Sequence, residues 1–290
     1  MTSLAETMTW PPDWVDAPVP VRLPIAAYRG PLVEAAAGRI LLRIPPVGRF
    51  LVQPDRPVRV DRIHSATDAD VACFVGGSVG AAALLLRGLL PMRAAAVAVA
   101  GAGVLICGQS AAGKSVLAAA LAGRGHAVLA DRVGLAHGAA PVLYPVDPEV
   151  QLWPDAVRLL ELDPAAGRLV RPVLTRRAFR LGPAPRPVPL RLVLLLSPGT
   201  VAAPRLDDLA DFADPGDPGD PGGRGSAAAR LTMLLGREWH GRLVDPLGRA
   251  PDRFGWLAAL AGAARVVLVQ GHRVGLPPAE LAASVEGLLG

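Results

Sequence analysis

Residues 108–115 carry the clearest chemical signal in the chain, reading Gly-Gln-Ser-Ala-Ala-Gly-Lys-Ser. This octet fits the pattern Gly-x-x-x-x-Gly-Lys-Ser/Thr, in which backbone N–H groups of a loop and of the next helix surround the phosphates of a nucleotide. In such a loop the lysine neutralises the β- and γ-phosphates and the Ser hydroxyl ligates Mg²⁺. The expected nucleotide contacts are Gly108, Gln109, Ser110, Ala111, Ala112, Gly113, Lys114, Ser115 and Val116.

Lys114 is the only lysine of the chain, because 29 of its 30 Lys+Arg residues are arginine. A compact ammonium fits inside a phosphate cradle, whereas a broad guanidinium does not. The bias toward Ala, Arg, Gly and Pro is typical of a GC-rich coding background. The position of the lysine is therefore more informative than its rarity, and it favours nucleotide binding.

Asp131 is the second residue with chemical potential. It follows the apolar run 127–130 and lies about sixteen residues after Ser115. A carboxylate at that place can hold Mg²⁺ or accept a proton from an attacking hydroxyl. The structural alternative is an aspartate that caps the turn after the strand. We predict a catalytic and metal-binding role for Asp131, with Ser115 as the other metal ligand.

The elements around the octet are those that a phosphate-binding loop requires. An apolar strand at 104–107 leads into the loop, and a helix at 115–122 follows it. A strand at 94–100 and a turn at 101–103 precede them. Further strands are expected at 40–44, 49–52, 58–60, 127–131, 188–196 and 265–270, and helices at 68–90, 226–237, 254–263 and after Pro277-Pro278.

Strands that alternate with helices around the loop predict an α/β fold. Residues 1–70, with short strands between prolines, are expected to form a small β-rich N-terminal region, and residues 71–290 the phosphate-loop domain. Residues 214–223 repeat Asp-Pro-Gly and are expected to be a flexible loop.

Composition argues against several classes of partner. The net charge is +5, but the arginines are scattered and aromatic residues make up only 4% of the chain, so nucleic-acid binding is not expected. Cys73 and Cys107 lie in apolar runs and are interpreted as buried hydrophobes, not as a disulfide or a metal site. The apolar stretches 79–90 and 94–107 are too short to span a membrane, and no signal peptide is visible. The expectation is a cytoplasmic protein without membrane contact.

Four segments resemble the HPr serine kinase family. They are Arg-Gly-Leu-Leu-Pro-Met-Arg-Ala-Ala-Ala-Val at 87–97, the octet at 108–115, Arg-Gly-His at 124–126 and Ala-Asp at 130–131. The sequence is most similar to the smaller HPr-kinase-related proteins encoded beside ribosomal peptide clusters, including those of lasso peptides. The likeness covers roughly residues 40–290, and its specific part is confined to 87–133.

This resemblance implies a P-loop kinase core related to phosphoenolpyruvate carboxykinase, with a mixed sheet and flanking helices. It implies ATP and Mg²⁺ as cofactors and a serine-type hydroxyl of a peptide or protein as acceptor. A role in ribosomal peptide maturation would follow from the gene context of the related proteins. Because the bacterial kinases of the family are commonly oligomeric, a homo-oligomer stays open.

The chain departs from the family pattern at three positions. Arg93 stands where the family has histidine, Arg132 where it has a second aspartate, and Ala111 where it has glycine. Arginine cannot act as a base near neutral pH, but it can stabilise charge on a transferred phosphoryl group. The candidate catalytic residues are therefore Asp131, Lys114, Arg93 and Arg132. The alternative is a nucleotide-binding pseudokinase or partner protein whose phosphotransfer is lost or altered, and a third reading is a P-loop enzyme that phosphorylates its substrate to activate it for a later step.

The remaining polar and aromatic residues carry weaker expectations. Arg176-Arg177 matches a Lys-Arg pair of the family and would contact phosphate or peptide, or else form a solvated loop pair. His126 is expected in a turn beside the phosphate-loop helix. No metal-ligand spacing connects His64, His137, His240 and His272, and Trp239 and Trp256 are expected to pack in the core or at the surface.

Overall fold

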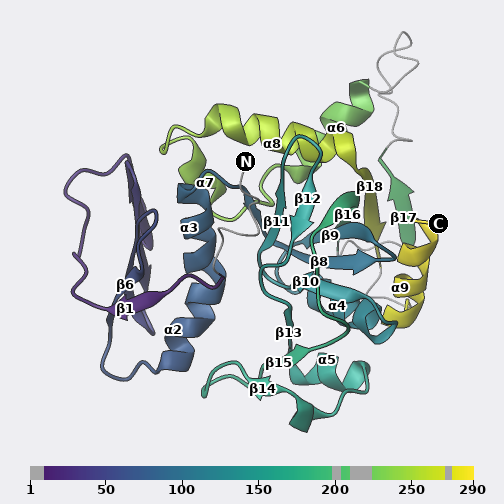
Figure 1. The fold of residues 1–290 in the computed structure, drawn as a ribbon, viewed down its shortest axis with the longest axis horizontal. Coiled ribbons are helices and arrows are strands. Elements are labelled where there is room, and N and C mark those ends of the chain that lie inside the picture. Colours follow the sequence, from purple (N-terminus) through teal and green to yellow (C-terminus); the bar gives the residue numbers. More distant parts are fainter. Residues whose placement is uncertain (1–9, 198–203, 210–223, 272–275) are drawn as a thin grey trace.

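The computed structural model describes residues 10–197, 204–209, 224–271 and 276–290. These residues form a mixed α/β fold with three sheets, namely a six-stranded N-terminal sheet (the small sheet), a nine-stranded sheet (the large sheet) and a third sheet of three strands (Figure 1). The predicted α/β class is confirmed. The Asp-Pro-Gly repeat at 214–223 and His272 lie outside the described residues.

The N-terminal sheet has six strands in the order β1-β6-β5-β4-β3-β2. Its predicted strands are confirmed as β4 to β6, whereas β1 to β3 were not predicted because they are short and interrupted by prolines. The bounds are β1 Trp14–Asp16, β2 Tyr28–Arg29, β3 Val33–Ala36, β4 Arg39–Ile44, β5 Gly48–Val52 and β6 Val58–Arg62. The sheet lies within the predicted region 1–70, whose boundary stays a prediction.

A helical stretch follows the sheet and differs from the single helix expected at 68–90. It consists of α2 (Asp68–Phe74), a π-helical turn (Val75–Val79) and α3 (Gly80–Leu86). Within the π turn Gly77 has a non-helical backbone, with φ −135° and ψ −115°. The stretch ends at Leu86 because Gly88 adopts φ +81° and Pro91 starts β7 (Pro91–Met92). The helix is therefore interrupted by consecutive glycines instead of being continuous as expected, whereas its end before Gly88 and Pro91 agrees with the prediction to within four residues.

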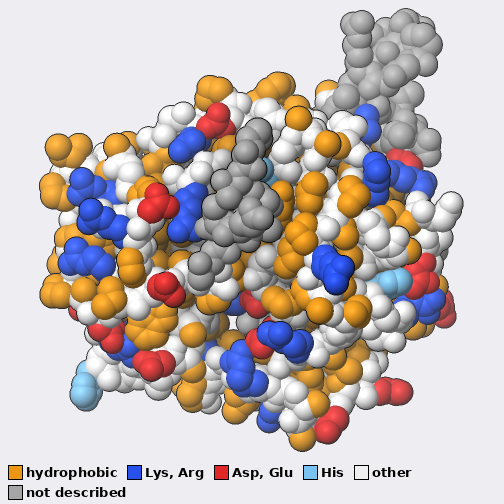
Figure 2. All heavy atoms as spheres, in the orientation of Figure 1, with side chains coloured by type: hydrophobic (Ala, Val, Ile, Leu, Met, Phe, Trp, Pro, Cys, Tyr) orange, Lys and Arg blue, Asp and Glu red, His pale blue; other side chains and the backbone are white. Residues whose placement is uncertain are grey.

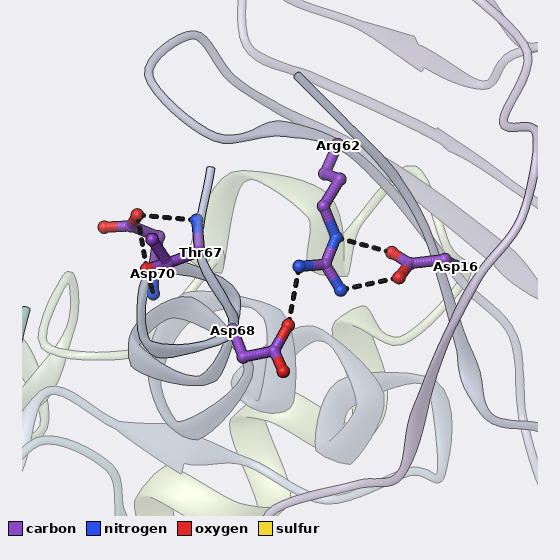
Figure 3. A network of polar contacts seen from close by, with 5 residues as sticks. All are labelled: Asp16, Arg62, Thr67, Asp68 and Asp70. Carbon is purple, nitrogen blue, oxygen red and sulfur yellow. Dashed lines mark hydrogen bonds and ion pairs between the residues drawn. The ribbon is translucent and has the colours of Figure 1, made fainter. Parts of the chain in front are cut away.

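Two polar networks fix the start of this helix (Figure 3). Thr67 forms a capping box with Asp70, because each accepts a hydrogen bond from the backbone N–H of the other. Beside it, the Arg62 guanidinium donates to both Asp16 carboxylate oxygens at 2.7 and 2.6 Å and to Asp68 at 2.6 Å. These bonds join strands β1 and β6 of the small sheet to the first turn of α2.

The helical stretch lies between the small sheet and the large one (Figure 1). Val71, Val75 and Val79 pack on the small sheet, while Ala81 and Leu84 pack on the core of the large sheet. With 19 residues and a mean hydropathy of 1.8, the stretch is long and apolar enough to cross a membrane. The sequence had marked only residues 79–90 as apolar here, which is too short for a span. Since 72% of its most apolar window is buried inside the molecule, it resembles the core helix of a globular domain.

The large sheet is mixed and has β16 (Val188–Ser197) at its centre. Strands β9 (Ala102–Gly108) and β18 (Arg265–Gln270) flank β16 in parallel. Beyond β9 come the antiparallel β8 (Ala94–Val99) and then β10 (Ala127–Ala130). Near-continuous apolar runs predicted these strands correctly, because both faces of the sheet are buried. The other strands of the sheet are β7, β11 (Gly134–His137), β12 (Val142–Tyr144) and β17 (Arg205–Asp208).

Helices cover both faces of the large sheet (Figure 1). Alternate residues of β9 point to opposite sides, so that Ile106 packs with α4 (Lys114–Gly123) and α9 (Pro278–Gly287), and Leu105 packs with α8 (Ala250–Ala263). The predicted helices are confirmed with shifted ends. The remaining helices are α6 (Arg224–Leu234) and α7 (Gly241–Val244).

A third sheet, which was not predicted, has the order β13-β15-β14. Its strands are β13 (Glu149–Leu152), β14 (Arg168–Leu169) and β15 (Arg177–Arg180), with α5 (Pro154–Leu159) and a 3-10 turn (Pro164–Ala166) between β13 and β14. Short strands rich in arginine carry a weak pattern in sequence. Their pairing depends on contacts with distant residues.

Candidate functional site

Strand register brings the predicted site residues to one edge of the large sheet. Both β9 and β10 run antiparallel to β8, so their carboxyl ends meet at the edge where β8 begins. Ala94 is paired with Cys107, and Ala96 with Ala130. The phosphate loop that follows β9 and Asp131 that follows β10 therefore flank Arg93, which precedes β8. Each of these segments can be recognised separately in the sequence, but only the pairing of β9 and β10 with β8 brings them to the same edge.

The octet forms a tight loop between β9 and α4. A Cβ at Gly108 would lie 3.0 Å from the Leu196 carbonyl oxygen on β16, closer than an ordinary contact, so a larger residue there would require the neighbouring backbone to shift. Gly113 has φ +95° and caps α4. Ala111 has φ +63°, a left-handed conformation that disfavours a residue with a Cβ. Ala111 stands where the resembling family has glycine, and its backbone adopts the conformation that glycine tolerates best.

Replacing Ala111 by glycine should relieve this strain. We expect Ala111→Gly to raise the free energy of unfolding by about 1 kcal/mol, because glycine adopts positive φ without a Cβ penalty. The measurement is urea denaturation monitored by circular dichroism. The matched control is Ala112→Gly, since Ala112 is buried and its φ is not positive. Ala112→Gly should lower stability, and equal changes in the two variants would contradict the strain argument.

Lys114 begins α4 and its side chain folds back over the loop. Its Nζ donates hydrogen bonds to the carbonyl oxygens of Gly108 at 3.0 Å and Gln109 at 2.8 Å. Burial lowers the pKa of Lys114. The charges of Arg237 and Arg93 lower it further, whereas Asp131 and Cys107 oppose the shift. The ammonium is therefore held inside the loop among other cations, in a place that favours an anion.

Asp131 is buried, with 2% of its surface exposed. Its Oδ2 accepts a hydrogen bond from the Gln151 backbone N–H at 2.9 Å, whereas its Oδ1 has no partner among the described residues. Burial raises the pKa of Asp131, and the nearby Ser115 hydroxyl, Gln151 N–H and Arg132 guanidinium oppose the rise. A buried carboxylate oxygen without a partner costs free energy unless a donor or a cation satisfies it. The site around Asp131 and Ser115 thus offers oxygen ligands of the kind that Mg²⁺ prefers.

A segment from the far end of the chain completes this edge. The backbone N–H of Arg93 donates to the Arg237 carbonyl at 2.7 Å, and that of Trp239 donates to the Pro91 carbonyl at 2.8 Å. Glu238 between them is buried and accepts a hydrogen bond at 2.6 Å from Arg253 of α8. Residues 237–239 therefore extend the strand pairing of 91–93 and bring Arg237 toward Lys114. The sequence had no local signal for Arg237, because its place depends on pairing across 144 positions.

Trp239 contacts Arg93 and Arg132, the two arginines at which the sequence departs from the pattern of the family it resembles. The Arg93 guanidinium lies 4.5 Å from the centroid of the Trp239 ring, and Trp239 Nε1 donates to the Arg132 carbonyl at 2.9 Å. The predicted packing role of Trp239 is thus only part of its function in the structure. A stacked guanidinium keeps its charge and its free N–H groups while its orientation is fixed. His240 Nε2 donates a hydrogen bond to the Ser78 carbonyl oxygen at 2.7 Å.

Arg132 points away from the phosphate loop. Its guanidinium donates to the Cys73 carbonyl at 2.8 Å and pairs with Asp147 at 2.8 Å. Asp147 is next to the Asp131 strand, because Ala130 and Asp147 form a β-bridge. Arg132 thus links the end of β10 to α2, and its charge opposes the rise in the pKa of Asp131 that burial causes.

The Arg176-Arg177 pair is not a solvated loop. Arg177 starts β15 and donates to the Gly167 carbonyl at 2.5 Å. Arg176 stacks over Trp153, 4.6 Å from the ring centroid, and donates to the Gln151 side chain at 3.4 Å. Because the Gln151 backbone binds Asp131, Arg176 lies two contacts from the predicted catalytic carboxylate.

Cys107 is buried and His126 lies in a turn, as the sequence predicted, whereas Cys73 is only partly buried, so its prediction as a buried hydrophobe was wrong. Neither Cys73 nor Cys107 is in a disulfide. His126 follows the turn after α4 and its Nε2 lies 2.7 Å from Glu286 of α9, which also binds Arg124. These bonds fix the far end of the phosphate-loop helix.

Comparison with known proteins adds a distant likeness to a solved structure. No protein-family model matches the sequence, and no curated protein matches it. The chain is similar to the solved structure of the Hpr(Ser) kinase/phosphatase from Coxiella burnetii at 14% identity, over 69% of this chain and 93% of that one, with a TM-score of 0.29. What this chain does has to be argued from its own residues.

Proposed function

We propose that this protein is an ATP- and Mg²⁺-dependent kinase that transfers the γ-phosphoryl group to a serine-type hydroxyl of a peptide or protein. The observation that carries the proposal is the meeting, at one sheet edge, of the phosphate loop with Asp131 and Arg93. Phosphoryl transfer needs mainly positioning and charge neutralisation, and these three groups supply both.

In the proposed site the loop amides and Lys114 hold the β- and γ-phosphates. Lys114 would exchange its bonds to the Gly108 and Gln109 carbonyls for phosphate oxygens. Ser115 and the Asp131 Oδ1 oxygen are the candidate protein ligands of Mg²⁺, which when bound would neutralise charge between the phosphates.

The transfer step follows from these positions. The acceptor oxygen forms a bond to the γ-phosphorus as the bond from that phosphorus to the β,γ-bridging oxygen breaks, and ADP leaves. The hydroxyl proton passes to Asp131, the carboxylate that directly follows β10 beside the loop. Arg93, oriented by Trp239, would stabilise the charge on the moving phosphoryl group.

The second candidate is a nucleotide-binding protein without phosphotransfer. The observation that favours it is the environment of Asp131, whose pKa is raised by burial and which has an arginine where the resembling family has histidine. A raised pKa reduces the fraction of the carboxyl that is ionised at a given pH, and only the ionised form can accept a proton. In this reading nucleotide binding would order the loop for a partner protein.

A transfer assay separates the two candidates. The full chain, incubated with ATP labelled in its γ-phosphate, Mg²⁺ and a panel of serine-containing peptides, should pass the label to peptide if it is a kinase. Omission of Mg²⁺ is the control, and mass spectrometry locates the modified hydroxyl. Saturable ATP binding with no label in any peptide and no hydrolysis would support the second candidate instead.

A further inference from the structure

A cavity of about 300 Å³ lies beside the proposed transfer site and contains no residue of the phosphate loop. One wall is formed by Ala72 and Cys73 of α2 and by Gly76 of the π-helical turn that follows it. The opposite wall is the third sheet, with Glu149 of β13 and Arg180 of β15. In Figure 2, blue and red side chains gather around a hollow over the β13–β15 sheet.

The cavity and the phosphate loop lie on two sides of Asp131. Gln151 lines the cavity and its backbone N–H binds the Asp131 carboxylate, while Ser115 approaches the same carboxylate from the loop. Arg132, the residue after Asp131, also lines the cavity. A group bound in the cavity therefore shares a wall with the place where the γ-phosphate would lie.

An ion pair ties the two walls of the cavity together. Arg171, just after β14, donates to Asp70 of α2 at 2.6 Å, and both side chains are largely buried. The Arg171 guanidinium also lies 5.3 Å from the Phe74 ring centroid. A buried pair with this geometry fixes the spacing of the elements it joins. The cavity is thus a built feature that depends on the N-terminal part of the chain.

The charges that line the cavity are not balanced. Arg132 pairs with Asp147 at 2.8 Å, and Arg168 pairs with Glu149 at 2.6 Å. Arg180 is exposed, and within the described part of the chain its guanidinium forms no ion pair or hydrogen bond. Three guanidinium groups therefore face two carboxylates, and the rest of the lining includes apolar side chains such as Val146 and Val170.

We infer that this cavity binds the acceptor as a peptide segment with acidic side chains next to its serine-type hydroxyl. Arg180 would pair with a carboxylate of the segment, the apolar lining would contact its aliphatic groups, and Gln151 would offer its side-chain amide to the peptide backbone. This inference rests on the proposed function for the identity of the acceptor, but binding in the cavity does not require transfer.

Cys73 offers a test that uses no ATP. Its thiol is partly exposed and lines the cavity, whereas Cys107 is fully buried and burial raises its pKa to about 12. Alkylation of the native chain by N-ethylmaleimide should therefore label Cys73 and spare Cys107. Two synthetic peptides of equal length would be added, one with Asp and Glu around a serine and one with Lys and Arg instead. We expect only the acidic peptide to slow Cys73 labelling, by fivefold or more at saturation as measured by mass spectrometry.

Variants of the cavity sharpen the result. Arg180→Gln should raise the acidic-peptide concentration needed for half-protection about tenfold. The matched control is Arg191→Gln on β16, because Arg191 is also exposed but does not line the cavity. Ala72→Leu fills the cavity from an exposed helix position and should weaken binding of a fluorescein-labelled acidic peptide, measured by anisotropy.

Three outcomes would overturn the inference. They are equal protection by the acidic and basic peptides, equal effects of the Arg180 and Arg191 substitutions, and full protection by inorganic phosphate alone, which would indicate a simple anion site. Cys73 protection by the acidic peptide without any phosphoryl transfer would retain the cavity and reject the kinase. Phosphoryl transfer to the acidic peptide without protection of Cys73 would retain the kinase and reject the cavity as the acceptor site.

Discussion

Lys114→Ala is expected to raise the dissociation constant for MgATP about a hundredfold and to abolish any transfer of its γ-phosphate. The ammonium makes two hydrogen bonds inside the loop, to oxygens that phosphate oxygens would replace. A charged hydrogen bond contributes about 1.5–3 kcal/mol, and a hundredfold change in affinity corresponds to about 2.7 kcal/mol. Isothermal titration calorimetry with MgATP measures the change directly.

The matched control for this variant is Arg124→Ala. Arg124 lies at the other end of α4 and is exposed, so its removal changes the net charge equally without touching the loop. We expect Arg124→Ala to leave the dissociation constant within about twofold, because exposed ion pairs contribute little and distant charges are screened. If both variants lost the same affinity, the lysine would act through net charge and the phosphate-loop assignment would fail. Lys114→Arg should also bind poorly, since a guanidinium is too broad for the cradle.

Asp131→Asn is expected to lower the rate of phosphoryl transfer by a factor of about 10³ and to leave the affinity for ATP in the absence of Mg²⁺ little changed. The amide cannot accept the acceptor's proton, yet it can still accept the Gln151 hydrogen bond. Single-turnover transfer and calorimetric binding on the same preparation separate the two effects. The control is Asp155→Asn, an exposed carboxylate on α5 outside the site, and equal loss of transfer in both variants would contradict the assignment.

The raised pKa of Asp131 predicts how the rate of transfer and the stability of the fold change with pH. Burial raises the pKa of this carboxyl, so the ionised base becomes available only as the pH rises through that elevated value. Transfer by the natural protein should increase across this range. A group whose folded pKa is raised stabilises the fold in its protonated form and loses that contribution as the pH rises above the unfolded value. Asp131→Asn should therefore unfold at higher urea concentration than the natural protein at pH 8, even though it loses transfer.

This opposition between stability and activity is informative by itself. A structural aspartate that only caps a turn would lose stability on substitution by asparagine. A functional carboxylate that is buried for its reaction, with Oδ1 unpartnered, would gain stability. One urea titration of Asp131→Asn therefore distinguishes the two interpretations that the sequence left open.

Sequence predicted the parts of the structure that are specified locally. The octet 108–115 needs only its own glycines, its lysine and the flanking apolar strand and helix to be identified. The central strands β9, β16 and β18 are nearly continuous apolar runs, which is the pattern of strands buried on both faces. The positive φ at Ala111 also followed from the pattern, because the position is one where a glycine is usual.

The third sheet and the cavity could not be predicted in the same way. Strand β14 has two residues and begins with an arginine, and β15 has four residues with an arginine at each end, so neither has an apolar pattern of its own. The wall of the cavity depends on Arg171 of one element reaching Asp70 of another, 101 positions apart. Pairing over that separation is selected by the complete fold, and no local propensity records it.

What the sequence determined by itself is which residues could do chemistry: an octet with the phosphate-loop pattern and its lysine, a strand-end carboxylate, and arginine at two positions where the resembling family has other residues. What only the tertiary structure decided is how those groups face one another. Register across β8 placed Arg93 between the loop and Asp131, and Trp239 from the far end of the chain oriented Arg93 and bound the backbone of Arg132. The physical reason is that side-chain identity is a property of one position, whereas the direction and burial of a charge depend on every element packed around it.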